Sequence, residues 1–453
     1  MLRQASRRLY ASLAARDANH FLHPMHNPAP TPRVWAGGNA EFLVDSEGNE
    51  FLDGLAGLWY CTAGLGRSEL VEAASKQMRE MAAASAYSPF SNARAIELAE
   101  RLATLTPAGL DHFFFTSGGA EATDTSCKLA RHYWRCLGQP TKTKVISRVS
   151  GYHGATLCGS ATGMMAPFHV LDDAAQALPG FCHIPSPGYR YEAPEGSTVS
   201  PGVAAANELE RAILAEGPET VACFLAEPVT GAGGVDVPPP DYFPRIREIC
   251  DQYDVLFVSD EVITGFGRTG RLFGVEHWGV VPDLLQFAKA VTSGYFPLGG
   301  VGVSGRIAAV LNNPSAPPFM HGYTYSGHPV GCATALAMLD LIEREKFPQQ
   351  AESKGAKLLA GLRAALGDHP HVGSVRGLGL QIGVEFMADK VTKRPFTPKE
   401  AVGAKVLDAC VKRGMVSRVR GDVFNLAPPI ILSEASIDRI VETLAGATRD
   451  VLG

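Results

Sequence analysis

The stretch that decides the fold is Val255-Leu256-Phe257-Val258-Ser259-Asp260, an apolar run that ends in a carboxylate. A second apolar run, Leu284-Leu285-Gln286-Phe287-Ala288-Lys289, ends in a lysine. Short runs that are apolar on both faces are typical of strands in a parallel sheet, which helices cover on either side. The carboxyl ends of such strands form one edge, where the ligands of open α/β sheets bind. We therefore expect Asp260 and Lys289 to lie near each other at that edge.

A lysine and an aspartate in this arrangement are the pair that pyridoxal 5'-phosphate (PLP) requires. The lysine amine condenses with the aldehyde of the cofactor, which makes it a covalent catalyst. The aspartate faces the pyridinium nitrogen and keeps it protonated, so that the ring can accept electrons. The pair therefore indicates PLP as the cofactor, with Lys289 and Asp260 as the catalytic residues.

Other apolar runs alternate with helical stretches between residues 61 and 330. The clearest are Phe113-Phe114-Phe115, Val145-Ile146 and Phe224-Leu225-Ala226. The alternation predicts an α/β fold, in which these strands join one mostly parallel sheet of a large PLP-binding domain.

The two ends of the chain have a different pattern. Residues 1–60 contain an arm and a hairpin, in which the strands 41–44 and 50–52 flank a turn. Residues 331–453 alternate helices with short strands. We expect the N-terminal and C-terminal segments to form a smaller α+β domain together.

The bulk composition indicates a globular enzyme. Of the 453 residues, 46% are hydrophobic and 19% charged, and the formal net charge is -5. A chain without a basic stripe has no electrostatic footprint for nucleic acid. No apolar stretch approaches the roughly twenty residues that span a bilayer, so we expect no membrane partner. The nine cysteines show no CxxC pair or metal-finger spacing, which favours reduced thiols, a cytoplasmic location and no metal site.

Four arginines precede the first acidic residue of the chain; they are Arg3, Arg7, Arg8 and Arg16. Such a pattern occurs in organellar transit peptides. It is also compatible with an amphipathic helix that packs on a partner subunit. We favour the helix, because Ser, Arg and Ala are also common in surface helices.

Polar groups follow the other predicted strands as well. Ser117-Gly118-Gly119 comes after the run at 113–115 and opens a helix, whose free N–H groups can bind a phosphate, although this triplet also occurs as an ordinary turn. Tyr152 follows the run at 145–146, and it can stack on a flat ring or be a buried core tyrosine. Glu227 follows the run at 224–226, and it can support the cofactor or gate the substrate, or serve as a cap or an ion-pair partner.

Five strands that each end in a group suited to PLP form a pattern that other enzyme classes do not match. The sheet lacks the GxGxxG turn of dinucleotide-binding enzymes and the GxSxG turn of serine hydrolases. A zinc site would need a close cluster of ligands. The histidines are far apart in the sequence and are interpreted as mostly structural; they include His153, His277, His321 and His328.

Asp260 opens a longer motif, Asp260-Glu261-Val262-Ile263-Thr264-Gly265-Phe266-Gly267-Arg268-Thr269-Gly270, which resembles the signature of the class III aminotransferases. These are PLP enzymes of fold type I, and the resemblance runs over nearly the whole chain. The 117–122 turn is similar to the family's phosphate turn, although its third residue is more often serine, and Asp124 stands where asparagine is more usual. Residues 321–329 are similar to the segment that crosses the family's dimer interface.

The resemblance implies a role for each site residue. Lys289 holds the cofactor and then moves the proton between the substrate carbon and the cofactor carbon. Asp260 pairs with the pyridinium, while Val262 packs on one face of the ring and Tyr152 stacks on the other. The phosphate is held by Ser117, Gly118, Gly119 and Thr324. Because Thr324 belongs to the neighbouring subunit in relatives, the resemblance implies a homodimer with shared active sites, which in some relatives pairs into a tetramer.

Three features are similar to the amine:pyruvate group of this family. Trp59 and Tyr87 stand where that group has the aromatic walls of its substrate pocket. Arg418 stands where the group has the arginine that binds a carboxylate, a task suited to a guanidinium because it donates to both oxygens. Trp59 could equally be a core aromatic residue, and Arg418 or Arg420 could form a surface ion pair.

These features predict a transaminase that moves an amino group from an amine or ω-amino acid to pyruvate, giving a ketone or aldehyde and L-alanine. The alternatives are other class III transaminases, acting on diaminononanoate or 4-aminobutyrate with 2-oxoglutarate as a possible acceptor. A PLP decarboxylase and an aminomutase also stay open. A non-catalytic PLP scaffold is disfavoured by the intact lysine and aspartate.

Overall fold

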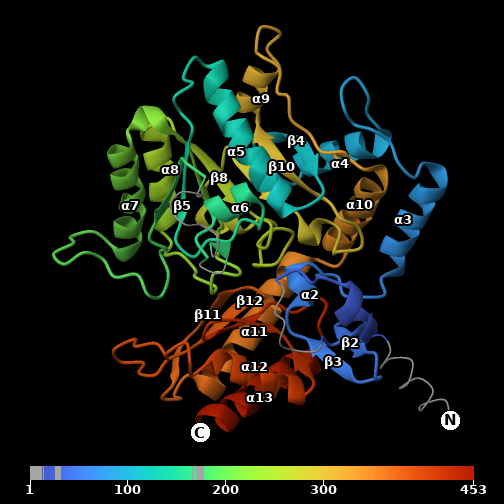
Figure 1. Ribbon diagram of the computed structural model, residues 1–453, viewed down its shortest axis with the longest axis vertical. Coiled ribbons are helices and arrows are strands. Elements are labelled where there is room, and N and C mark those ends of the chain that lie inside the picture. The colour runs from blue at the N-terminus through green and yellow to red at the C-terminus, as the bar shows by residue number, and fades with distance from the viewer. Residues whose placement is uncertain (1–12, 14, 26–31, 166–167, 170–177) are drawn as a thin grey trace.

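The computed structural model describes residues 13, 15–25, 32–165, 168–169 and 178–453. Its centre is a seven-stranded sheet in the order β4-β10-β9-β8-β7-β5-β6 (Figure 1). The strands are β4 (Leu110–Thr116), β5 (Lys144–Arg148), β6 (Phe181–Ile184), β7 (Val221–Ala226), β8 (Leu256–Asp260), β9 (Leu284–Phe287) and β10 (Gly299–Ser304). Neighbouring strands from β6 to β9 are parallel, and β10 runs antiparallel to both β9 and β4. The predicted mostly parallel α/β sheet is confirmed.

Both faces of this sheet are buried by helices. Leu225 and Val258 pack in one apolar cluster with α5 (Gly119–Cys136), whereas Phe224 and Phe257 point the other way. On that second face the packing helices include α8 (Tyr242–Gln252) and α10 (Pro329–Arg344). Because successive strand residues face opposite sides, strands that are apolar throughout need cover on both.

The remaining helices of this part surround the sheet. They are α3 (Ser68–Glu80), α4 (Ala93–Ala103), α6 (Leu157–Thr162), α7 (Pro201–Glu216) and α9 (Gly305–Leu311), with the 3-10 turns η2 (Pro218–Thr220), η3 (Gly274–Trp278) and η4 (Lys289–Val291). The helix predicted to open after Ser117-Gly118-Gly119 corresponds to α5.

Two smaller sheets join the ends of the chain. One pairs β1 (Trp35–Asn39), β2 (Phe42–Asp45) and β3 (Glu50–Asp53) with β13 (Met415–Val416), in the order β1-β2-β3-β13. The other has the order β11-β12-β15-β14, and contains β11 (Val372–Leu378), β12 (Gln381–Phe386), β14 (Arg418–Arg420) and β15 (Val423–Leu426). The predicted hairpin is confirmed, because β2 and β3 pair antiparallel.

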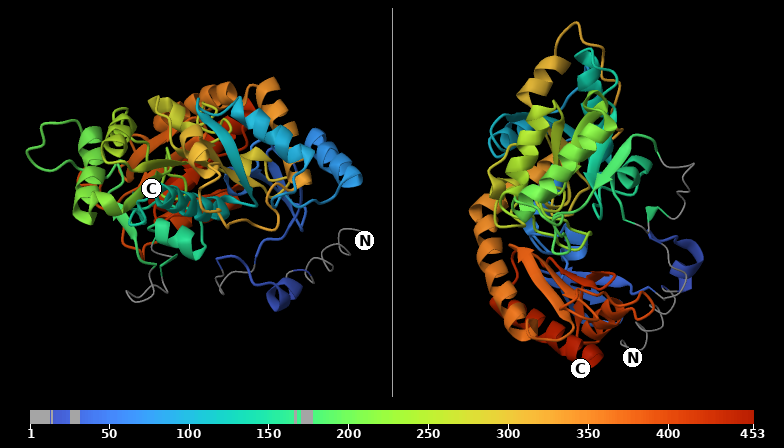
Figure 2. Two further views of the ribbon diagram at one scale, coloured as in Figure 1. Left: turned by 90° about the horizontal axis from the view of Figure 1, so that it is seen from above. Right: turned by 90° about the vertical axis from the view of Figure 1, so that its left-hand side faces the viewer.

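The N-terminal and C-terminal segments therefore meet in space, as Figures 1 and 2 show. The parallel pairing of β13 with β3 connects them, and the helices α11 (Phe347–Leu366), α12 (Val402–Lys412) and α13 (Glu434–Leu452) pack against one another and the strands. The short helix α2 (Ala56–Trp59) lies where this lower part meets the large sheet (Figure 1). Domain boundaries at residues 60 and 330 stay a prediction.

Of the four N-terminal arginines, Arg16 alone lies among the described residues. Arg3, Arg7 and Arg8 lie outside the described residues, while residues 15–20, which include Arg16, are helical. Within the described part of the chain, none of the helices is long and apolar enough to cross a membrane.

Candidate active site

Lys289 lies where β9 ends and the turn η4 begins. Its backbone is left-handed (φ 47°), an uncommon conformation for a residue with a side chain, and strain of this kind is concentrated at functional sites. The side chain is half-buried, but its amine lies deep among protein atoms. Burial lowers the pKa of Lys289 to about 8, although the carboxylates of Asp260 and Glu227 oppose this shift. The amine is therefore poised to lose its proton near neutral pH.

Asp260 ends the neighbouring strand β8, and the predicted proximity to Lys289 follows from the parallel pairing of β8 with β9. One carboxylate oxygen, Oδ1, accepts a hydrogen bond from the Val262 N–H at 3.1 Å. The other, Oδ2, lies 2.7 Å from Nδ1 of His153. A carboxylate has about four acceptor sites, so both oxygens keep room for a further donor.

His153 is a site residue that the sequence reasoning missed, since it was interpreted as structural with the other histidines. Its ring is buried, and Nε2 has no hydrogen-bond partner among the described residues. Its carbonyl accepts from the Thr123 hydroxyl of α5 at 2.8 Å, and the same hydroxyl lies 3.2 Å from Oε1 of Gln286 on β9. This chain of contacts fixes the ring against Asp260. The signal was its position beside Tyr152 at a strand end.

Glu227 follows β7 and is buried, and its carboxylate organises two loops. Oε1 accepts from the Tyr152 N–H at 3.2 Å, and Oε2 accepts from the Gly231 N–H at 2.7 Å. Burial raises the pKa of Glu227, with His153 opposing the shift. Burial also raises the pKa of Tyr152, and the positive charge of Arg418 opposes this shift. The carboxylate of Glu227 thus caps two backbone N–H groups, in agreement with the interpretation as a cap. A role of Glu227 toward a cofactor stays a prediction.

The turn Ser117-Gly118-Gly119 follows β4 and opens α5, whose N-cap residue Gly118 offers no side-chain cap. The Ser117 N–H donates to Glu121 Oε2 at 2.7 Å, so this amide is already engaged. The first N–H groups of α5 have no partner within the helix and lie at its positive end. They provide a place for an anion.

Trp59 lies beside Lys289, with the ring centroid 5.8 Å from Nζ. The ring is 3% exposed and packs with a small cluster separate from the main core, which includes Leu55, Ile263 and Ala427. Trp59 is therefore both a buried aromatic residue and a neighbour of the Lys289 amine. Its contact with substrate stays a prediction.

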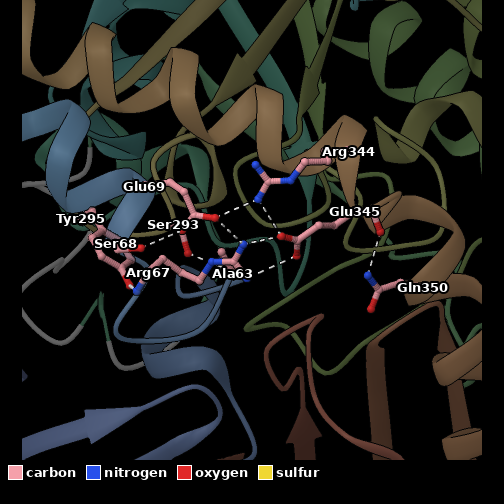
Figure 3. A network of polar contacts seen from close by, with 9 residues as sticks. All are labelled: Ala63, Arg67, Ser68, Glu69, Ser293, Tyr295, Arg344, Glu345 and Gln350. Atoms are coloured by element: carbon pink, nitrogen blue, oxygen red, sulfur yellow. Dashed lines mark hydrogen bonds and ion pairs between the residues drawn. The ribbon is translucent and has the colours of Figure 1, made fainter.

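A polar network fixes the segment after Trp59 onto the loop after Lys289 (Figure 3). The Ala63 N–H donates to Ser293 Oγ at 2.9 Å, and the Arg67 N–H donates to the Tyr295 hydroxyl at 2.7 Å. The Arg67 guanidinium in turn pairs with Glu345 beyond α10. These contacts hold Trp59 and Lys289 in one rigid framework.

Tyr87 and Thr324 are both exposed, and the structure places them outside the buried cluster of Asp260 and His153. The Tyr87 ring lies against Gly322, where an added Cβ would be 2.9 Å from the ring. The Tyr323 hydroxyl donates to the Glu121 carbonyl at 3.0 Å, so this segment lies along α5. Thr324 is exposed, and its contact with a neighbouring subunit stays a prediction.

Arg418 and Arg420 belong to β14 and differ in their surroundings. Arg418 Nη2 lies 3.0 Å from Met25 Sδ, a weak acceptor, and forms no ion pair with a described residue. Arg420 donates from Nη1 to the Gly233 carbonyl and from Nη2 to Ser150 Oγ. Within the described part of the chain, neither Arg418 nor Arg420 forms the surface ion pair that was the alternative prediction.

The residues present fit PLP. An added Cβ on Gly118 would meet no atom within 4 Å, whereas one on Gly119 would lie 2.9 Å from Val262 Cγ1. The turn thus has open space on one side and packs on its other side against the residue predicted to cover the ring. No group of three or more possible metal ligands occurs among the described residues.

Comparisons with known proteins agree with this geometry. The family model for class III aminotransferases matches residues 26–448. The chain is 44% identical to the putrescine–pyruvate aminotransferase of Pseudomonas aeruginosa, over 91% of this chain and 89% of that protein. It is 40% identical to the diaminobutyrate–2-oxoglutarate transaminase of Halomonas elongata, over 96% and 93%.

Solved structures give the same result. A thermostable (S)-enantioselective ω-transaminase from Thermomicrobium roseum superposes with a TM-score of 0.93 at 44% identity, covering 98% of this chain and 99% of that one. The ω-transaminase of Pseudomonas jessenii in complex with PMP, at 36% identity, also gives 0.93 and covers 97% and 98%. The chain belongs to the class III aminotransferases, which are PLP-dependent enzymes of fold type I.

Proposed function

We propose that this aminotransferase transfers the amino group of an amine or ω-amino acid to pyruvate, giving a ketone or aldehyde and L-alanine. The observation that carries the proposal is the difference between the two arginines of β14. Among the described residues, Arg418 has a hydrogen-bond contact with a thioether alone and is available for a carboxylate, whereas Arg420 is engaged by Gly233 and Ser150. One available guanidinium suits an acceptor with one carboxylate, as pyruvate has.

The residues around Lys289 suit the proton transfers of this reaction. PLP, when bound, supplies the electron sink that lets a carbon–hydrogen bond of the donor break. Lys289 would hold the cofactor through its amine and, once the donor amine has taken its place, would be the base that moves the proton of the donor. Its lowered pKa leaves a substantial neutral fraction at neutral pH, as a base requires.

The remaining roles are assigned from position. Asp260, which contacts His153 and the Val262 N–H, would pair with the pyridinium nitrogen, and Val262 and Tyr152 would cover the two faces of the ring. Glu227 holds the Tyr152 turn and lies on the cofactor's hydroxyl side. Ser117, Gly118 and Gly119 receive the phosphate at the start of α5, with Thr324 from a second copy of the chain in a homodimer.

The donor side of the pocket is aromatic in this proposal. Trp59 lines the space beside the lysine amine, and the exposed Tyr87 completes the wall when a second subunit is present. Aromatic walls favour donors with an apolar body over strongly charged ones.

A single-turnover experiment tests the acceptor assignment. The PLP-loaded protein is mixed with L-alanine or L-glutamate, without any keto acid, and the released keto acid is measured. We expect rapid release of pyruvate from L-alanine and slow release of 2-oxoglutarate from L-glutamate. Faster release from L-glutamate would contradict the proposal and support 2-oxoglutarate, the acceptor named for the Halomonas relative.

A further inference from the structure

Arg420 joins two turns that carry site residues. Its Nη2 donates to Ser150 Oγ at 3.3 Å, two residues before Tyr152. Its Nη1 donates to the Gly233 carbonyl, in the turn that begins at the Gly231 amide bound by Glu227. One guanidinium therefore bridges the loop after β5 and the loop after β7.

These two turns are in direct contact and under strain. Ser150 is left-handed (φ 72°), which is unfavourable for a residue other than glycine. A Cβ added to Gly233 would lie 2.3 Å from the Ser150 carbonyl oxygen, so the two backbones touch. A strained conformation persists only where its surroundings fix it, and Arg420 is the charged group that bonds to both turns.

Arg420 also fixes the strand that carries Arg418. Residues two apart on a strand face the same side, so Arg418 and Arg420 project from the same face of β14. The pairing of β14 with β15 sets Arg418 opposite Asn425 and Arg420 opposite Val423. Burial lowers the pKa of Arg420, but a guanidinium keeps its charge at physiological pH.

We propose that Arg420 is a positioning residue, which holds the Ser150 and Gly233 turns against β14 and so fixes Arg418 relative to Tyr152 for the acceptor carboxylate. The inference rests on the carboxylate role proposed for Arg418. Arg420 itself makes no contact with substrate in this arrangement, since its donors point to Gly233 and Ser150.

Arg376 on β11 provides a matched control. Its Nε and Nη2 donate to the carbonyls of Val235 and Gly234, in the same loop that Arg420 holds. It pairs with the buried carboxylate of Glu385, and within the described chain it forms no hydrogen bond or ion pair with Ser150 or β14. Removing Arg376 therefore loosens the loop and lowers stability without releasing Arg418.

The experiment compares Arg420→Met with Arg376→Met in the PLP-loaded protein, using pyruvate and acetaldehyde as acceptors. Acetaldehyde lacks only the carboxylate, so the ratio of the two KM values reports on carboxylate binding. We expect Arg420→Met to raise the KM ratio of pyruvate to acetaldehyde about tenfold, and Arg376→Met to change it less than about twofold. Amide hydrogen exchange of residues 148–154 should become faster in Arg420→Met, a readout that does not depend on activity.

Two further variants keep the proposal falsifiable if Arg420→Met does not fold. Arg420→Lys and Ser150→Ala each remove the contact at Ser150 Oγ, and each should raise the KM ratio about two- to threefold. An unchanged ratio in both, or an equal change in Arg420→Met and Arg376→Met, would overturn the inference. If Arg418→Met leaves the KM ratio of pyruvate to acetaldehyde unchanged, the carboxylate role proposed for Arg418 is wrong. Unaltered amide hydrogen exchange of residues 148–154 in Arg420→Met would separately refute the inference that Arg420 holds the Ser150 and Gly233 turns.

Discussion

Lys142 and Lys289 are two lysines whose amines lie inside the same molecule, and their surroundings are opposite. Lys142 is 3% exposed, and its ammonium lies within hydrogen-bond distance of four backbone carbonyls, more than its three N–H donors need; they belong to Pro218, Val221, Tyr253 and Asp254. Trp134 covers it at 4.5 Å from Nζ to the ring centroid. The Lys289 amine has Trp59 at 5.8 Å and no hydrogen bond with a described residue.

The difference teaches what makes a buried lysine reactive. Burial lowers the pKa of both residues, because the charged form loses its hydration. At Lys142 the four carbonyls replace the lost water and use all the donors of the ammonium, so the group is structural. Among the described residues no acceptor replaces the water at Lys289, and the amine keeps a lone pair when it loses its proton. This difference separates Lys289 from the structural Lys142 and supports the catalytic role that we propose for Lys289.

The largest effect should come from removing each of the two lysines in turn. Lys289→Ala should reduce transamination by at least about a thousandfold with little loss of stability, because both the covalent bond to the cofactor and the proton carrier disappear. Lys142→Met should instead lower stability by several kcal/mol, on the order of the charged hydrogen bonds it removes, and leave kcat near its original value in the folded fraction. Steady-state rates and urea unfolding separate the two. Borohydride reduction that attached the cofactor to a lysine other than Lys289 would refute the assignment.

Asp260→Asn should have the next largest effect. A neutral amide cannot stabilise a protonated pyridine nitrogen, and breaking a buried charge pair costs about 3–5 kcal/mol. We expect PLP affinity and proton abstraction both to fall strongly, as measured by equilibrium dialysis and by the deuterium isotope effect on kcat. Near-original rates would mean that the ring lies elsewhere. Lys142 is far from Asp260 along the chain, and we expect Asp260→Asn to leave the carbonyl contacts of Lys142 unchanged.

The two lysines should also differ in their response to pH. In protein freed of PLP, an amine-reactive reagent should modify Lys289 with a rate that rises through pH 8, at least about a hundredfold faster near neutrality than exposed lysines. The folded state binds fewer protons at Lys289 than the unfolded state between about pH 8 and 10.5, so this group makes stability rise with pH across that window. Mass-spectrometric labelling measures the first effect. A midpoint near 10.5 would show that burial of the amine is unimportant.

The arginines of β14 repeat the contrast, since Arg420 donates to two oxygen acceptors, whereas the acceptor of Arg418 among the described residues is a weak one, the Met25 thioether. Arg418→Ala should raise KM for pyruvate and for L-alanine by about ten- to hundredfold, the worth of a charge-assisted bidentate contact of roughly 1.5–3 kcal/mol. KM for an amine without a carboxylate should change little. Equal losses for both substrate types would instead indicate a structural role for Arg418.

The sequence predicted the parts of the site that depend on local pattern. Asp260 and Lys289 could be placed because each ends an apolar run, and parallel strands bring such ends together. The strand β10 was not identified, since Gly-Gly-Val-Gly-Val-Ser lacks the usual strand residues. Its glycines are required by packing: a Cβ on Gly300 would lie 2.6 Å from the Phe287 ring.

The missed contacts depend on turns whose conformation the sequence does not reveal. His153 reaches Asp260 only because the preceding turn contains a left-handed Ser150. The contact of Arg420 with that turn spans 270 residues, and no local pattern carries such a pairing. For the same reason the sequence alone could not decide whether Arg418 or Arg420 forms a surface ion pair.

The smallest effect should come from changing Thr324. We propose that this residue reaches the Lys289 site of the other subunit in a homodimer. Thr324→Ala should lower PLP affinity about two- to tenfold, because a neutral hydrogen bond contributes about 0.5–1.5 kcal/mol. A bulky change, Thr324→Trp, should inactivate by blocking the phosphate. Mixing that variant with Lys289→Ala should then restore activity, since one site of each hybrid dimer combines an intact lysine with an intact threonine. Native mass spectrometry verifies that the subunits exchange. Hybrids that form but stay inactive would show that Thr324 serves its own chain. In that case the surroundings of Lys289, like those of Lys142, would be built by a single subunit.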